Sequence, residues 1–120
     1  MNEEYVNKEI TRKLIDKGCP VTEVFISDDR PILYELPKSD PNWFKCKAWY
    51  IPTIFQVLKW LREEKKIHIS IDYKCRFGKW YWCAYSLNKQ EKVEVFSECI
   101  YENYEQTVIA GIEYVIDNLI

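Results

Sequence analysis

The chain has 120 residues, 48% hydrophobic and 30% charged, so it is long enough to bury a core and its composition excludes a disordered chain. Its 17 basic and 19 acidic side chains give a formal net charge of -2, which argues against the bulk phosphate attraction of autonomous nucleic-acid-binding domains. No apolar run approaches the roughly 20 residues that cross a bilayer, and the start MNEEYVNKEI lacks the pattern of a secretory signal. We therefore expect a cytoplasmic protein with no membrane partner, folded as a single globular domain over residues 1–120.

A helix is predicted near the start of the chain. Asn2 can cap it, and the apolar residues Val6, Ile10 and Leu14 recur every four positions on one face. Gly18 is expected to end this helix in the left-handed conformation.

Three β-prone segments follow the first helix. Residues 22–27 and 31–36 flank a turn-forming stretch of aspartates and a proline, which predicts a hairpin. Residues 43–50 alternate between apolar and polar side chains, a pattern typical of a half-buried strand.

The second half of the chain predicts a helix, three strands and a final helix. Thr53 and Gln56 have the spacing of a capping box, and Asn103 and Gln106 repeat this relation before the last helix. The three predicted strands cover residues 67–75, 80–87 and 92–97. Because the connections are short, we expect an α+β fold with an antiparallel meander sheet of five to six strands and three helices, in the order α-β-β-(β)-α-β-β-β-α.

The hairpin over residues 73–85 is rich in aromatic and basic side chains. If Arg76, Phe77 and Gly78 form its loop, residues 67, 69, 71 and 73 share a core face with residues 81, 83, 85 and 87. Trp80, Trp82 and Phe96 then lie on the opposite face. The candidate binding residues of this hairpin surface are Trp80, Trp82, Phe96, Lys74, Arg76 and Lys79.

Three interpretations of this aromatic face stay open. Another element of the chain covers it, or it binds a protein or small ligand, or it stacks bases of a nucleic acid. Asp72 would lie opposite Trp82 in this register, and its carboxylate would repel phosphate, so nucleic acid is the weaker candidate. Self-association into a dimer also stays open.

Nothing in the sequence points to catalysis. His68 is the only histidine and is expected on the face away from Cys75 and Cys83, which argues against a Cys–His nucleophile pair. Cys75 and Cys83 are expected to be buried and inert, whereas Cys46 lies between two lysines and is the least certain to be inert. We predict a non-enzymatic protein with no cofactor and no metal.

The segment 50–71 and the ending 101–120 resemble a group of small uncharacterised proteins from Bacteroides-type gut bacteria and their phages. Members show an Ala-Pro-Thr start, a Trp-Leu-Arg-Glu segment, an Ile-His-Ile strand and a Tyr-Glu helix that ends in Leu-Ile; here Ile51 replaces the alanine. The resemblance implies a phage or mobile-element setting and no particular activity. Among the matched residues, we add Trp60 and Arg62 to the candidate binding residues.

From Thr53 onward, the predicted order α-β-β-β-α resembles a double-stranded-RNA-binding domain, and the three strands followed by a helix resemble integrase arm-binding domains. The first family needs lysines at the start of its last helix, where this chain has YENYEQ. Fold likeness does not establish function. The preferred hypothesis is an interaction protein that binds a host protein or small ligand through an aromatic surface, and the alternative is a nucleic-acid-binding module that uses the 73–85 hairpin.

Overall fold

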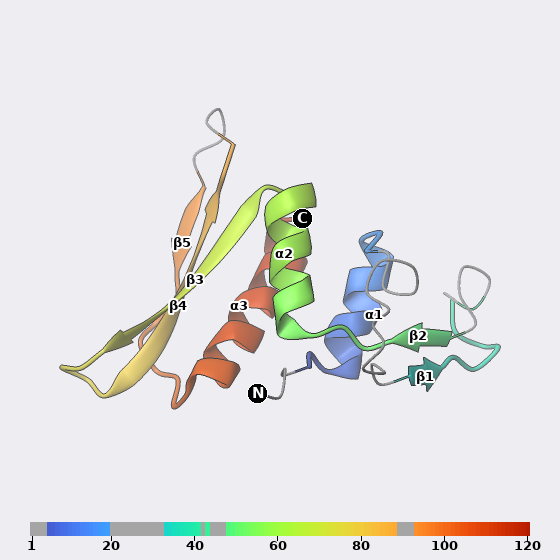
Figure 1. Cartoon of the computed structure of the whole chain (residues 1–120), viewed down its shortest axis with the longest axis horizontal. Helices are drawn as coiled ribbons and strands as arrows, with labels where there is room; N and C mark the ends of the chain where they lie inside the picture. The colour runs from blue at the N-terminus through green and yellow to red at the C-terminus, as the bar shows by residue number, and fades with distance from the viewer. Residues whose placement is uncertain (1–4, 20–32, 42, 44–47, 89–92) are drawn as a thin grey trace. The chain divides into compact units, whose positions relative to one another are not determined.

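The computed structural model describes residues 5–19, 33–41, 43, 48–88 and 93–120, and at residues 33, 34 and 48–50 it describes the backbone only. The elements, in chain order, are α1 (Lys8–Asp16), β1 (Leu33–Glu35), β2 (Ala48–Tyr50), α2 (Ile54–Glu64), β3 (Ile67–Lys74), β4 (Lys79–Ser86), β5 (Glu94–Phe96) and α3 (Tyr104–Asn118) (Figure 1). The α+β class is confirmed. The chain divides into two compact units, residues 1–56 and residues 57–120.

Within the first unit, α1 begins later than the sequence predicted. Its cap is Asn7 and not Asn2, because the Asn7 side chain accepts a hydrogen bond from the Ile10 amide at 2.8 Å. Ile10 and Leu14 are fully buried, as their spacing predicts. Gly18 has a φ of +85° just after the helix, which confirms its left-handed conformation.

The first unit also holds a two-stranded antiparallel sheet formed by β1 and β2, with Leu33 paired to Tyr50. This pairing joins the second and third predicted strands. The predicted strand over residues 22–27 lies outside the described residues, so its hairpin with residues 31–36 stays a prediction. Arg12 of α1 forms an ion pair with Asp40 at 2.9 Å, which connects the helix to the loop after β1.

The capping box that begins α2 is confirmed. The Gln56 side chain accepts from the Thr53 amide at 2.9 Å, and the Thr53 hydroxyl accepts from the Gln56 amide at 3.1 Å. These two bonds satisfy amides at the helix start that have no partner within the helix. The pair is therefore explained by local structure.

The second unit is built on a three-stranded antiparallel sheet in the order β3-β4-β5. A single meander of five to six strands is therefore not confirmed, because the described strands form two separate sheets. Helix α3 packs against β3 and β4 on one face of the sheet (Figure 1). We call this the helix face, and the opposite one the outer face.

Helix α3 approaches the sheet closely at Gly111. A Cβ atom added at this glycine would lie 3.1 Å from Cγ2 of Ile69 and 3.2 Å from Cγ of Trp82, which is tighter than ordinary van der Waals contact. Asn103 caps this helix by accepting from the Gln106 amide at 2.8 Å. The glycine therefore lets a well-formed helix lie close to the sheet and cover its central side chains.

Among the described residues, no helix is both long enough and apolar enough to span a membrane.

Candidate interaction surface

The register of the β3–β4 hairpin differs from the sequence prediction by one residue. Lys74 pairs with Lys79, Ile71 with Trp82, and Ile67 with Ser86, so odd positions face even ones. The turn contains four residues, Cys75–Gly78, and the amides of Phe77 and Gly78 both donate to the Lys74 carbonyl. The predicted three-residue loop was wrong, and the extra turn residue moves every β4 side chain to the other face.

Both hairpin tryptophans consequently lie on the helix face. Trp82 is only 4% exposed and packs on Tyr114 of α3, with ring centroids 4.9 Å apart. Trp80 is half-buried, and the centroid of its ring lies 5.1 Å from that of Tyr73 and 5.9 Å from that of Tyr104. The prediction that the two indoles share a face with Phe96, opposite the isoleucine face, was wrong. Of the three interpretations, coverage by the chain itself holds for Trp82.

The outer face carries a different set of side chains. It consists of His68, Ser70, Asp72 and Lys74 on β3, Lys79, Tyr81, Cys83 and Tyr85 on β4, and Glu94 and Phe96 on β5. Phe96 is 61% exposed, and Tyr81 and Tyr85 are half-buried beside it. Both tyrosine rings contact neighbours on the outer face. The ring centroids of Tyr85 and His68 are 5.2 Å apart, and the Lys74 ammonium lies 5.2 Å from the centre of the Tyr81 ring.

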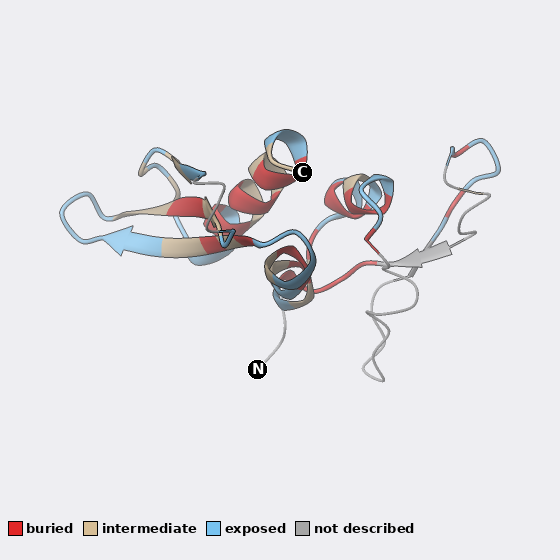
Figure 2. Ribbon diagram, turned by 90° about the horizontal axis from the view of Figure 1, so that it is seen from above, coloured by how far each residue is buried: buried red, intermediate tan, exposed pale blue. Residues whose placement is uncertain are grey.

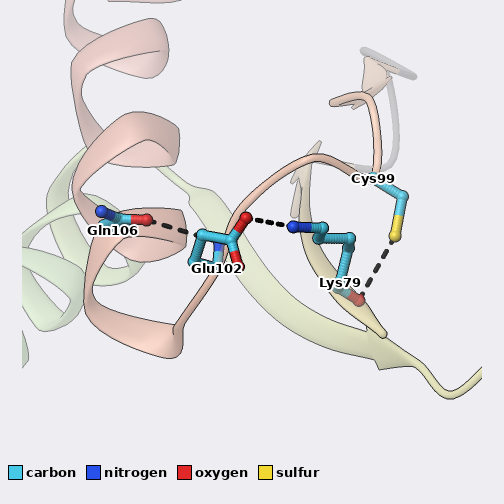
Figure 3. A network of polar contacts seen from close by, with 4 residues as sticks. All are labelled: Lys79, Cys99, Glu102 and Gln106. Carbon is cyan, nitrogen blue, oxygen red and sulfur yellow. Dashed lines mark hydrogen bonds and ion pairs between the residues drawn. The ribbon is translucent and has the colours of Figure 1, made fainter. Parts of the chain in front are cut away.

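The charges of the outer face are mixed. Lys79 is paired with Glu102, which lies just before α3 and whose amide also donates to the Gln106 side chain (Figure 3). The Lys79 carbonyl accepts from the Cys99 thiol at 3.3 Å, which ties the same strand end to the segment before the helix. Lys79 therefore has a structural partner and does not present a free cation.

Cys83 lies on the outer face and not on the isoleucine face that the sequence predicted, although it is buried as expected. It therefore shares a face with His68, which removes the sequence argument against a Cys–His pair. Burial raises the pKa of the Cys83 thiol, the carboxylates of Glu94 and Asp72 raise it further, and a hydrogen bond with Ser70 opposes them. A thiol held in its neutral form is a poor nucleophile, so this environment does not favour covalent catalysis.

The remaining predicted residues lie in several places. Arg76 and Cys75 are exposed in the turn, so the prediction that Cys75 is buried was wrong. Trp60 is only 7% exposed on α2, which makes it a core residue, and Arg62 is half-buried. Cys46 lies outside the described residues.

Described residues line two hollows at the end of the sheet away from the hairpin turn. One, of about 300 Å³, is lined by Tyr85, Ser86, Val93 and Glu94. The other, of about 90 Å³, is lined by Lys65, Ile67, Ser86, Val93 and Leu119. The larger hollow is at the lower limit of the usual volume of small-ligand sites, which begins at about 300 Å³.

Within the described ranges, no group of three or more histidine, cysteine, aspartate or glutamate side chains is placed to hold a metal ion. Comparisons with protein-family models, with curated proteins and with solved structures find no match for this chain.

Proposed function

We propose that this chain is a non-enzymatic interaction protein that binds a host protein through the outer face of its three-stranded sheet. The main support for this proposal is that Phe96 is exposed beside Tyr81 and Tyr85, on the face opposite the one that α3 packs against. The resemblance to proteins of Bacteroides-type bacteria and their phages supports a phage or mobile-element setting.

A protein partner fits the composition of this face better than a phosphate-rich one does. Large aromatic side chains are frequent in the centre of protein interfaces, where a few residues account for most of the binding free energy. The acidic side chains of Asp72 and Glu94 are exposed on the same face, and Lys79 is already paired with Glu102. Such a face presents apolar area and both signs of charge, which is typical of a protein-binding surface.

The test compares two phenylalanines that have the same exposed fraction. Phe96 on the outer face and Phe55 on α2 are each 61% exposed, so replacing either by alanine removes a similar exposed ring. Proteins captured from a host lysate by the wild type are purified and titrated against each variant by calorimetry. We expect Phe96→Ala to raise the Kd by about 30-fold, the effect of a hot spot of about 2 kcal/mol, and Phe55→Ala to leave it unchanged. Equal affinities of wild type and Phe96→Ala for every captured protein would exclude this face as the site.

The second candidate is nucleic-acid binding by the hairpin turn. Arg76 and Lys74 are exposed there beside the exposed ring of Phe77, whereas Trp82 is buried and cannot stack on a base. This function predicts a complex at low salt whose affinity falls steeply as salt is added, and its loss in Arg76→Glu. Fluorescence anisotropy with labelled single-stranded and duplex DNA and RNA measures it. An unchanged signal at low salt would remove this candidate and leave the protein-binding proposal standing.

A further inference from the structure

Strand β3 has one edge with no partner strand in the described chain. The amides of Trp80, Trp82 and Ser86 donate to groups on the β5 side of β4, whereas the Leu87 amide donates to Lys66, which precedes β3. Even-numbered residues of β4 therefore bond towards β5, and odd-numbered ones bond towards β3. In an antiparallel ladder, this alternation directs the backbone N–H and C=O of Ile71 and Tyr73 away from the sheet.

The half of this edge next to the hairpin turn is open. Figure 2 shows β3 changing from buried residues at its start to exposed ones at its end. Ile67 and Ile69 are 8% and 6% exposed, whereas Tyr73 is 48% exposed between the exposed residues Asp72 and Lys74. An open strand edge with outward-pointing backbone groups is a template on which another strand can pair.

We propose that β3 pairs antiparallel with β3 of a second copy of this chain, about a two-fold axis at Tyr73. The two Tyr73 residues then exchange backbone hydrogen bonds, and the two sheets join into one of six strands. This contact uses the β3 edge and does not depend on the outer-face function proposed above.

Charge complementarity selects this register among its neighbours. With the axis at Tyr73, Asp72 of each copy lies directly opposite Lys74 of the other, which makes two reciprocal ion pairs. An axis at Asp72 would place two carboxylates opposite each other. An axis at Ile71 would place Asp72 opposite Ser70 and Lys74 opposite His68, so the Asp72–Lys74 pairs would not form. Direct like-charge pairs across a sheet are destabilising, so the Tyr73 register is favoured.

The side chains of a single copy are suited to this partner. Within the described residues, neither Asp72 nor Lys74 forms an ion pair, and Lys74 lies opposite Lys79 across the hairpin. On the helix face, the ring centroids of Tyr73 and Trp80 are 5.1 Å apart. Tyr73 of the second copy would therefore extend an existing row of aromatic rings. The second copy therefore supplies a counter-charge on one face and an aromatic neighbour on the other.

The experiment measures the dimer Kd of the full chain by sedimentation equilibrium. We expect Asp72→Lys and Lys74→Asp each to raise the Kd by about tenfold, because each replaces two attractive cross-strand pairs by two repulsive ones. The double variant Asp72→Lys, Lys74→Asp exchanges the two charges and should recover the wild-type Kd within about threefold. Tyr73→Pro removes an N–H that points away from the sheet, so it should abolish the dimer while circular dichroism stays unchanged.

The matched control is Glu94→Lys, which makes the same charge change as Asp72→Lys on the same face but on β5. It should leave the dimer Kd unchanged. A wild-type chain that stays monomeric up to about 1 mM would overturn the proposal, because such an association is too weak to matter. Failure of the double variant to recover the Kd, or an equal effect of Glu94→Lys, would overturn the proposed register.

Discussion

Replacing Trp82 by alanine tests the observed register directly. The side chain is 4% exposed beneath α3, so its removal leaves a cavity between Ile69, Gly111 and Tyr114. Truncating a buried tryptophan costs about 3–5 kcal/mol, and about 1 kcal/mol is recovered because the Trp82 indole N–H has no hydrogen-bond partner among the described residues. We expect the free energy of unfolding to fall by about 3 kcal/mol. Urea denaturation followed by far-ultraviolet circular dichroism should show the midpoint falling by about 2 M.

Two further variants sharpen this measurement. Trp82→Phe keeps most of the buried apolar area and removes the unpaired donor, so it should cost less than about 1 kcal/mol. Phe96→Ala removes a ring that is 61% exposed on the outer face and should cost less than about 0.5 kcal/mol. If Trp82→Ala were as mild as Phe96→Ala, Trp82 would lie outside the core and the observed register would be refuted.

Four other predictions concern packing, thiols and a buried carboxylate. Gly111→Ala should lower the free energy of unfolding by about 1 kcal/mol in thermal denaturation, because overpacking against β3 and β4 outweighs a helix-propensity gain of about 1 kcal/mol; a stabilised variant would contradict the close helix–sheet approach. An alkylating reagent should modify Cys75 in the folded chain and Cys83 only after unfolding, as peptide mass spectrometry would show, and rapid labelling of Cys83 would contradict its burial. Burial raises the pKa of the Cys83 thiol, so the folded chain binds this proton more tightly than the unfolded chain does. The resulting contribution to the free energy of unfolding is fully present below the ordinary thiol pKa and should be lost as pH rises through the raised pKa. Cys83→Ala should therefore reduce the fall in the free energy of unfolding at alkaline pH. Asp40→Ala removes a carboxylate that is 2% exposed and bonded to the half-exposed Arg12, so urea denaturation should show a loss of about 2 kcal/mol; no loss would mean that this pair does not stabilise the first unit.

The helices and most strands could be predicted because their signals are local. A capping box such as Thr53 with Gln56 needs only two residues three positions apart, and both of its hydrogen bonds are present. The cap of α1 was misplaced because Asn2 and Asn7 are both good caps, and the chemistry of the residue type does not distinguish them. The strands β3, β4 and β5 each fall within or near the predicted ranges.

The candidate site could not be predicted to the same depth, because it depends on which face each side chain occupies. A turn of three residues and a turn of four residues both suit the segment around Gly78, yet they place Trp82 on opposite faces. In the predicted register, Ile71 and Cys83 share the core face. That register agrees with the alternation of apolar and polar side chains along β3, but it leaves the largest side chains, Trp80 and Trp82, outside the core. A preference for burying the bulkiest apolar residues with the isoleucines would have found the observed register.

The sequence by itself determined the α+β class, the caps of α2 and α3 and the approximate extents of β3, β4 and β5, since these depend on neighbouring residues and on short periodic patterns. Only the tertiary structure decided the hairpin register, the burial of Trp82 and the exposure of Phe96. The physical reason for this register is the packing of α3, because the close approach at Gly111 fits a sheet face that carries both Ile69 and Trp82. Phe96, Tyr81 and the charged side chains of β3 then lie on the outer face. Long-range packing of this kind joins residues more than 25 positions apart, from Trp82 to Gly111, which no local pattern in the sequence records.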